Sequence, residues 1–501
     1  MSASRNEFAR PRTVERVKRG WRRLFNLVCV LFVLSLVPLA VYTWNRYLVT
    51  FAEREAPEIL ITKPPPGVGL EPAVFTFTVR DAQAGVDEII VRTEQSGEIE
   101  TVYQQRVPSK TKETEVSITL GGKQSRLREG TMRVMVLAFD RAFWSNSAQS
   151  STELVVDFRA PDIEVVTQQH NAVRGGVELV FYKVAGEQNG YSGVAVGPEL
   201  FPGFTAAKLD QEFAGLSDLR FALFAVPWQF DDREHVVKVV ARDVVGNTSS
   251  ASMYYRVRDR GYRQREVQLS ESFLRSQVDP LYESYLRDLA RLQGSEAEKF
   301  VPARTLDEVL GRTRILLRDY PPLVETALKP LFHRTKPERF WSEPFNRVVG
   351  RRLPYDFGDT LLYRFGEVEL GRLRQSGTSY RTAPNEQIRA ANAGQVLYAG
   401  ELGLRGKTLI LDHGFGLMTL YSHLQSIECK VGDRVEPGAV IAVAGSSGWA
   451  GEPQTDLEFR LHGIPVRPEE WWDRNWLKGH IEDKIAHAKR LVGLTAGNPS
   501  E

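Results

Sequence analysis

The feature that most constrains how this chain can fold is an uncharged, apolar run of 21 residues near its N-terminus. Residues 24–44 read LFNLVCVLFVLSLVPLAVYTW, with no charged side chain among them. A helix rises about 1.5 Å per residue, so this run matches the ~30 Å hydrocarbon core of a bilayer. The sequence therefore predicts a transmembrane helix over residues 24–44.

The residues on either side of this run indicate its orientation. Residues 1–23 carry eight Arg or Lys side chains against two Glu, and basic segments stay on the cytoplasmic side of a membrane. We therefore expect a basic cytoplasmic tail over 1–23 and a single-pass anchor in the inner (cytoplasmic) membrane. The bulk of the chain is then expected in the periplasm or outside the cell. A cleaved signal peptide is the alternative, but the run is long for one and no small-residue cleavage site follows it.

Composition sets the broad class of the remaining chain. The 501 residues are 42% hydrophobic and 26% charged, which is typical of globular domains. Lys and Arg number 65 against 63 Asp and Glu, a net charge of +2. A nucleic-acid binder normally concentrates basic charge, so we expect no nucleic acid among the partners.

A sequence repeat follows the apolar run. The tetrapeptide at 56–59, Ala-Pro-Glu-Ile, returns as Ala-Pro-Asp-Ile at 160–163, and the strand-like stretch at 134–140 returns at 237–243. Two motifs repeated at nearly the same offset indicate a duplication of units of ~100 residues. Two unrelated β-domains are the alternative.

Each repeat has the alternating pattern of short β-strands, as in Val74–Val79 and Glu115–Leu120. We predict two β-sandwiches, over 52–158 and 159–259, and they resemble the immunoglobulin-like (Ig-like) modules of bacterial surface proteins. Their expected role is that of a spacer or binding platform. Asp140 and Asp243 close the repeated strand, and we expect them to form turns rather than to bind metal.

Residues 262–345 change to a helical pattern. Apolar side chains recur every three or four residues from Phe273 to Leu292, and Gly294 then predicts a helix end. Thr305 and Glu308 predict a capping box for a second helix, which Pro321-Pro322 is expected to break. This helical connector would either pack on its neighbours or act as a regulatory arm over the next domain.

The C-terminal region combines short β-runs with glycine-rich turns. Its motifs include Asp412-His413-Gly414, Tyr421-Ser422-His423 and Leu457-Glu458-Phe459, in a fixed order. In this order and spacing the chain resembles the LytM/lysostaphin-type zinc endopeptidase family, which cuts peptide crosslinks of bacterial cell wall. The resemblance implies a compact antiparallel β domain with a narrow groove over 346–480. The tail over 481–501 is basic and then contains Gly, Pro and Ser, so we expect a helix followed by a loose end. The expected fold class of the whole chain is mainly β.

The resemblance also implies where zinc and the catalytic groups would lie. The family binds zinc with His and Asp of a His-x-x-x-Asp motif and with the second His of a His-x-His motif. Here Gln375 and Ser379 stand at the first two ligand positions, and Glu458 stands at the third. Asp456 replaces the other His of the pair, which leaves His423 as the retained catalytic position. Gln and Ser are poor zinc ligands, so we expect no zinc and no other cofactor.

Two functions remain open at this stage, together with a purely structural spacer role. The favoured one is a non-catalytic envelope protein, similar to LytM-domain proteins that lack zinc ligands and activate cell-wall amidases. It would bind peptidoglycan or a cell-wall hydrolase through groove residues, for which the candidates are His413, Tyr421, Asp456 and Glu458. The alternative is an active metalloendopeptidase that cuts peptidoglycan crosslinks with zinc in an altered site.

Overall fold

The computed structural model describes residues 25, 28, 30–44, 51, 53–108, 111–123, 126–186 and 190–494. The chain forms two compact units, Met1–Arg159 with Val245–Asn247, and Ala160–Val244 with Thr248–Glu501.

The predicted N-terminal tail and membrane segment lie partly outside this description. All of 1–23 and residues 24, 26, 27 and 29 fall outside it, and residues 30–44 are helical. Among the described residues, no helix combines the length and the apolar character that a bilayer crossing requires. The membrane segment over 24–44 therefore stays a prediction.

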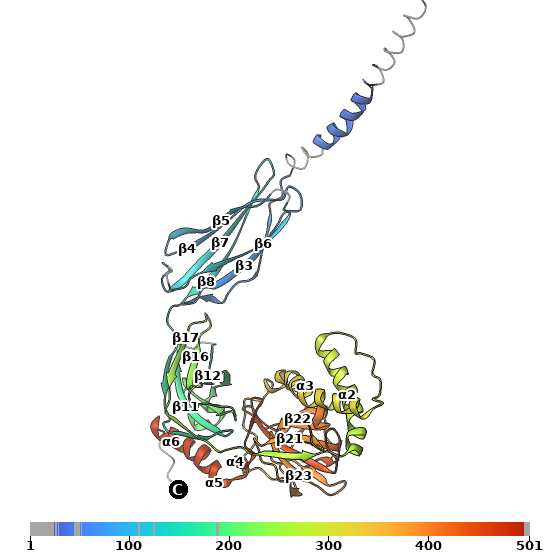
Figure 1. Ribbon diagram of the computed structural model, residues 1–501. Helices are drawn as coiled ribbons and strands as arrows, with labels where there is room; N and C mark the ends of the chain where they lie inside the picture. Colours follow the sequence, from blue (N-terminus) through green and yellow to red (C-terminus); the bar gives the residue numbers. More distant parts are fainter. Residues whose placement is uncertain are drawn as a thin grey trace, which may run out of the picture. The chain divides into compact units, whose positions relative to one another are not determined.

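The first unit contains two β-sheets that enclose a hydrophobic core (Figure 1). One sheet has the order β1 (Glu58–Lys63), β3 (Ala73–Arg80), β6 (Glu113–Leu120). The other has the order β2 (Gly67–Val68), β8 (Ser147–Val156), β7 (Gly130–Asp140), β4 (Val86–Gln95), β5 (Glu98–Arg106). Phe75, Phe77 and Val79 of β3 are fully buried, because alternate residues of a strand face one side. The predicted period of two is confirmed in β3 and β6.

The second unit begins with two sheets that repeat this strand order. One sheet has the order β9 (Asp162–Val165), β11 (Val177–Ala185), β15 (Leu219–Ala225), β14 (Phe204–Thr205). The other has the order β17 (Thr248–Ser252), β16 (Val237–Arg242), β12 (Tyr191–Val196), β13 (Glu199–Pro202). A short parallel pair, β10 (His170–Val173) and β18 (Tyr255–Arg258), lies beside them. The sequence repeat thus has a matching repeat in sheet topology.

The segment 262–345 is not helical throughout, which corrects the expectation of a purely helical connector. Its first element is a strand, β19 (Gln264–Gln268), which pairs in parallel with β21 (Thr360–Phe365). β22 (Val368–Arg374) completes this three-stranded sheet. Two helices follow β19, namely α2 (Glu271–Gln293), which ends at Gly294 as predicted, and α3 (Leu306–Phe332), which begins with the predicted capping box.

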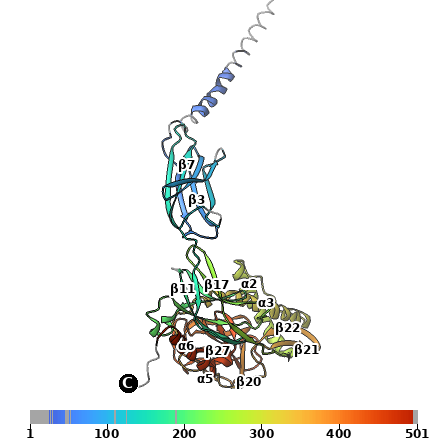
Figure 2. The same cartoon turned by 90° about the vertical axis from the view of Figure 1, so that its left-hand side faces the viewer.

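The prediction that Pro321-Pro322 breaks the second helix is wrong. α3 continues through both prolines to Phe332. Val324, Leu328 and Phe332 beyond the prolines are buried in the same core cluster as Leu316, so packing outweighs the lost backbone hydrogen bonds. Gly371 lets α3 lie close to β22, because a Cβ at Gly371 would come within 2.8 Å of the Leu317 side chain. Figure 2 shows α3 beside β22.

A ten-stranded, largely antiparallel sheet forms the centre of the C-terminal part. Its main path is β20 (Arg351–Arg352), β23 (Gly377–Arg381), β30 (Gln454–Leu461), β27 (Leu417–Ile427), β26 (Lys407–Asp412), β25 (Gly394–Glu401), β28 (Arg434–Val435). Three further strands lie off this path: β29 (Val440–Ala444) pairs with β27 and with β24 (Gln387–Arg389), and β31 (Ile464–Val466) pairs with β30. The expected antiparallel β domain therefore lies in this region.

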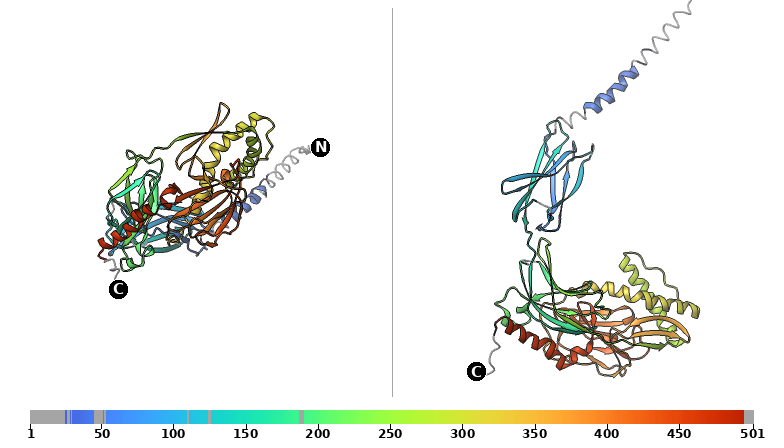
Figure 3. Two further views of the ribbon diagram at one scale, coloured as in Figure 1. Left: turned by 90° about the horizontal axis from the view of Figure 1, so that it is seen from below. Right: turned by 60° about the vertical axis from the view of Figure 1, so that its left-hand side comes forward.

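The helix expected within residues 481–501 is observed. The chain continues after β31 through α4 (Pro468–Trp472), α5 (Arg474–Leu477), a π-helical turn (Lys478–Glu482) and α6 (Asp483–Leu491). Ile485 and Ala488 of α6 are buried, and Lys484 contacts the buried carboxylate of Glu178 in β11. Figure 3 shows α6 beside the strands of the second sandwich. The second sandwich and the C-terminal β domain therefore share one core, because the helices between them bury side chains against both.

A second buried acid, Glu470 in α4, also links these two parts. Its Oε2 accepts a hydrogen bond of 2.9 Å from the Val177 amide. Burial raises the pKa of Glu470 to about 8, against the pull of the Val177 amide and of Arg467. The folded state therefore favours the protonated acid, and this contribution to stability is lost as pH rises from 4.5 through about 8.

We predict that Glu470→Gln removes the loss of folding stability that the wild type shows as pH rises from 4.5 through about 8. At pH above about 8 the variant should be more stable than wild type by more than about 1 kcal/mol, since one pKa unit corresponds to about 1.4 kcal/mol. Urea unfolding followed across the pH range measures it. Glu436→Gln, at an exposed acid of the same unit, is the control and should keep the wild-type pH dependence. A parallel pH dependence in Glu470→Gln and wild type would contradict the assignment.

Candidate functional site

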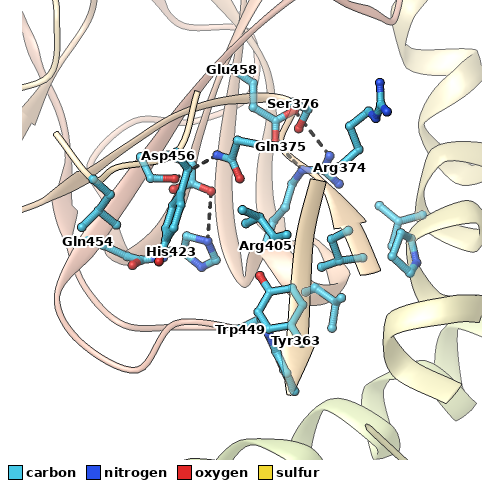
Figure 4. Close-up of a pocket in the computed structure, with 18 residues that line it drawn as sticks. Tyr363, Arg374, Gln375, Ser376, Arg405, His423, Trp449, Gln454, Asp456 and Glu458 are labelled. Carbon is cyan, nitrogen blue, oxygen red and sulfur yellow. Dashed lines mark hydrogen bonds and ion pairs between the residues drawn. The ribbon is translucent and has the colours of Figure 1, made fainter. Parts of the chain in front are cut away.

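One pocket brings together the five positions that the sequence resemblance singled out (Figure 4). Gln375 lies between β22 and β23, Ser379 on β23, His423 on β27, and Asp456 and Glu458 on β30, and all five line the pocket. Strand pairing explains why they meet, because β23 and β27 flank β30 on its two sides. Ser379 pairs with Asp456 in this register.

His413 and Tyr421 do not line this pocket, which corrects their expected role in the groove. Both side chains are fully buried. The His413 ring contacts the Ala393 carbonyl at 2.6 Å and the Thr419 hydroxyl at 2.8 Å, and burial lowers its pKa to about 4. The Tyr421 hydroxyl accepts a hydrogen bond from the Ala391 amide. Residues 417–424 are buried on both faces of the sheet, so a polar side chain there serves the core.

The first two ligand positions of the resemblance bind each other. Nε2 of Gln375 donates a hydrogen bond of 2.9 Å to Oγ of Ser379, and both residues are buried. Neither side chain carries a charge, and neither offers zinc a nitrogen or carboxylate ligand.

The third ligand position, Glu458, is neutralised by two arginines. Its carboxylate lies 2.7 Å from Nε of Arg405 and 3.0 Å from a guanidinium nitrogen of Arg460. Glu458 is 3% exposed, so burial alone would raise its pKa, but the two guanidinium groups hold the pKa at about 2. Both carboxylate oxygens therefore accept charged N–H donors from the protein.

A fourth side chain completes this ion network, and it comes from helix α3, which lines one side of the pocket. Glu325 of α3 lies 2.6 Å from Arg460 and 3.2 Å from Arg405. The charges of two Arg and two Glu thus balance at the position where the zinc endopeptidases that the sequence resembles have a metal ligand. Sequence reasoning missed the other three members of this network. Arg460 could have been found, because it follows Asp456 and Glu458 at alternate positions of one strand, whereas Arg405 and Glu325 come from distant elements.

His423, the retained catalytic position, pairs with Asp456. Its Nδ1–H donates to the Ser447 carbonyl at 2.8 Å, and its Nε2 lies 3.5 Å from the Asp456 carboxylate. Burial opposes the charged ring, but Asp456 outweighs it and raises the pKa of His423. His423 has a φ of 63°, a left-handed conformation that costs a non-glycine residue of order 1 kcal/mol.

The pocket offers His423, Asp456 and Glu458 as possible metal ligands. Within the described part of the chain, the ligand atoms of these three residues do not lie close enough together to hold one ion. Chemically, the arrangement is a neutral ion network on one side and a histidine–carboxylate pair on the other.

We predict that this network stabilises the fold. Arg405→Ala should lower the free energy of unfolding by about 3 kcal/mol at neutral pH, since it leaves a buried carboxylate with one partner fewer. The difference should shrink as pH falls from 4.5 toward about 2, where Glu458 takes up its proton. Arg434→Ala removes an exposed ion pair with Glu338 and should cost no more than about 1 kcal/mol. Equal losses in the two variants, measured by urea unfolding, would show that the network is not stabilising.

Comparisons with known proteins place this pocket in a family. The model of peptidase family M23 matches residues 374–468, which include all five pocket positions. The chain is 36% identical to the murein hydrolase activator EnvC of Escherichia coli over 113 residues. This stretch is 23% of this chain and 27% of that protein. It is 32% identical to the DD-carboxypeptidase/endopeptidase Mpg of Neisseria meningitidis over 93 residues. That stretch is 19% of this chain and 21% of that protein.

A putative peptidase M23 from Pseudomonas aeruginosa is among the similar solved structures. It matches 60% of this chain and 94% of its own at 16% identity, with a TM-score of 0.33. The chain spans about a quarter of the length of the two curated relatives named above. Residues 374–468 form a LytM-type domain of peptidase family M23 within this longer chain.

Proposed function

We propose that this protein is a non-hydrolytic regulator of a cell-wall hydrolase, and that its M23 domain binds a partner without cutting peptidoglycan. The observation that carries the proposal is the position of Glu458 between Arg405 and Arg460. A metal ion at Glu458 would have to displace two guanidinium groups from a buried carboxylate. Losing those ion pairs in the protein interior costs several kcal/mol, which a site with few other ligands does not offset.

The two relatives support different roles. The match to a murein hydrolase activator supports murein as the setting and regulation as the role, whereas the match to a carboxypeptidase/endopeptidase supports the alternative of an active peptidase. Regulation is favoured, because four of the five pocket positions carry residues other than those of the zinc enzymes that the sequence resembles.

The pocket keeps two groups that a bound partner would satisfy. Within the described part of the chain, Oδ1 of Asp456 is buried and has no hydrogen-bond partner, so it would accept a hydrogen bond from a bound donor. Arg374 is exposed at the edge of the pocket and offers a positive charge to a carboxylate. A partner segment that carries an N–H donor and an acidic group fits these two positions.

We further propose that residues 24–44 hold the protein in the cytoplasmic membrane, with the Ig-like modules and the M23 domain on the outer side. The proposal rests on the uncharged run and on the basic residues before it.

The first test asks whether the purified full chain holds zinc and cuts cell wall. We expect much less than one zinc per chain by elemental mass spectrometry after dialysis, and no release of crosslink-cleavage products from sacculi. Stoichiometric zinc together with cleavage that is lost in His423→Ala would show an active endopeptidase and would overturn the proposal.

The same preparation tests regulation of a hydrolase directly. Added to a purified cell-wall amidase of the source organism and dye-labelled sacculi, the chain should increase dye release several-fold. Arg374→Ala should lose most of this stimulation, since it removes the charge at the pocket edge. Arg372→Ala, on the same strand and paired with Glu369, is the matched control and should keep it. Binding to sacculi with no effect on any amidase would favour peptidoglycan as the ligand and contradict the proposed regulation.

The anchor is tested by fractionation. The full chain should remain in the membrane pellet after alkaline carbonate extraction, and a chain that lacks residues 1–44 should move to the soluble fraction. Release of the full chain by carbonate would contradict the anchor.

A further inference from the structure

Three acidic side chains converge in the first unit, far along the chain from the M23 domain. Glu53 precedes β1, Asp81 follows β3, and Asp140 ends β7. Each contributes one carboxylate oxygen to a group in which all three oxygens lie within 4.8 Å of one another. All three residues are buried. Three negative charges at this separation repel one another strongly, so a compensating positive charge is needed among them.

One carboxylate oxygen of Glu53 lacks a partner that would offset this repulsion. The residue is 5% exposed, and its Oε2 is a buried oxygen with no hydrogen-bond partner in the described part of the chain. Burial and then the charges of Asp81 and Asp140 raise the pKa of Glu53 to about 7, against the opposing effect of a hydrogen bond from the Ala84 backbone. A buried acceptor of this kind is normally satisfied, so an unpaired one indicates a missing partner.

The two aspartates are held in place by the backbone, as metal ligands usually are. Oδ1 of Asp81 accepts hydrogen bonds from the amides of Gln83 and Gly85, at 3.0 and 2.7 Å. Oδ1 of Asp140 accepts from the amides of Ala142 and Asn146, at 3.1 and 2.8 Å. The expected turn-forming role of Asp140 is therefore observed, but these bonds also fix its carboxylate in the orientation in which it faces the cluster.

Asn146 also ties the Glu53 segment to this site. Its Nδ2 contacts Oδ2 of Asp140 at 2.8 Å and the carbonyl oxygens of Glu53 and Glu55 at 3.4 and 3.3 Å. The cluster thus joins the segment before β1 to the turns after β3 and β7.

We propose that Glu53, Asp81 and Asp140 bind a Ca²⁺ ion. Ca²⁺ takes oxygen ligands at about 2.3–2.6 Å, so two ligands on opposite sides of one ion lie roughly 5 Å apart. The three carboxylate oxygens lie within 4.8 Å of one another, so one ion could contact all three. An all-oxygen, all-carboxylate set selects a hard cation rather than zinc, which prefers nitrogen and sulfur ligands. Three carboxylates are fewer than the ligand set of the tightest sites, so we expect a Kd of about 0.1–1 mM, as in extracellular modules.

The sequence repeat provides an internal comparison. The second copy keeps Asp243 at the position of Asp140, but the strand pairing aligns Ala185 with Arg80, so Gly186 stands where the first copy has Asp81. The proposed site therefore belongs to the first module. Bound Ca²⁺ would neutralise the cluster and hold Glu53 against the turns that follow β3 and β7.

Calcium titration of the purified full chain at pH about 8, where Glu53 is largely ionised, tests the proposal. Isothermal titration calorimetry should show one Ca²⁺ per chain. About 10 mM Ca²⁺ should raise the midpoint of the first thermal transition by about 4 °C or more. Glu53→Gln should weaken binding at least tenfold and abolish the thermal shift. Glu98→Gln removes an exposed carboxylate on β5 of the same module and should leave both unchanged.

Two results would overturn the proposal. The first is wild-type protein that gives neither heat nor a thermal shift with Ca²⁺; the cluster would then share a proton instead, and Glu53→Gln would stabilise the protein at that pH. The second is Ca²⁺ affinity that is unchanged in Glu53→Gln. The wild-type titration decides the question even if the variant does not fold.

Discussion

A carboxylate buried as deeply as Glu458 needs positive charge inside the protein, because an unpaired buried charge is strongly destabilising. Arg405 and Arg460 supply that charge, and Glu325 balances them from α3. The chemistry of the pocket depends on this network. It keeps Glu458 ionised and fixes α3 over the sheet. It also places guanidinium groups where the zinc endopeptidases that the sequence resembles would bind a metal.

The M23 domain is packed into a larger unit. The helices that follow its last strand bury side chains against the second sandwich, and Glu178 and Glu470 take part in buried polar contacts there. Polar groups buried at such a junction favour one arrangement over others, because any shift would leave them unpaired. The second sandwich is therefore more than a spacer within its own unit, since it covers part of the C-terminal core.

Patterns local in sequence predicted much of the fold. The period of two identified β3 and β6, and Gly294 and the Thr305–Glu308 capping box marked helix ends that the structure confirms. The break at Pro321-Pro322 was wrong, because burial of the apolar stripe beyond it compensates for two missing amide donors. β19 was missed, because its five residues gain their strand conformation from pairing with β21, about 95 residues later in the chain.

Residue types at fixed spacing were enough to identify the family of residues 374–468, the duplication of the β-sandwich and the five pocket positions. Which polar residues lie in the pocket, and what neutralises them, could be found only from the fold. His413 and Tyr421 belong to the core, since strands on both sides bury them, and Glu458 gains Arg405 and Glu325 from elements far away in the chain. The physical reason is that burial and ion pairing depend on distances in space, and spacing along the chain fixes those distances only within a single helix, strand or turn.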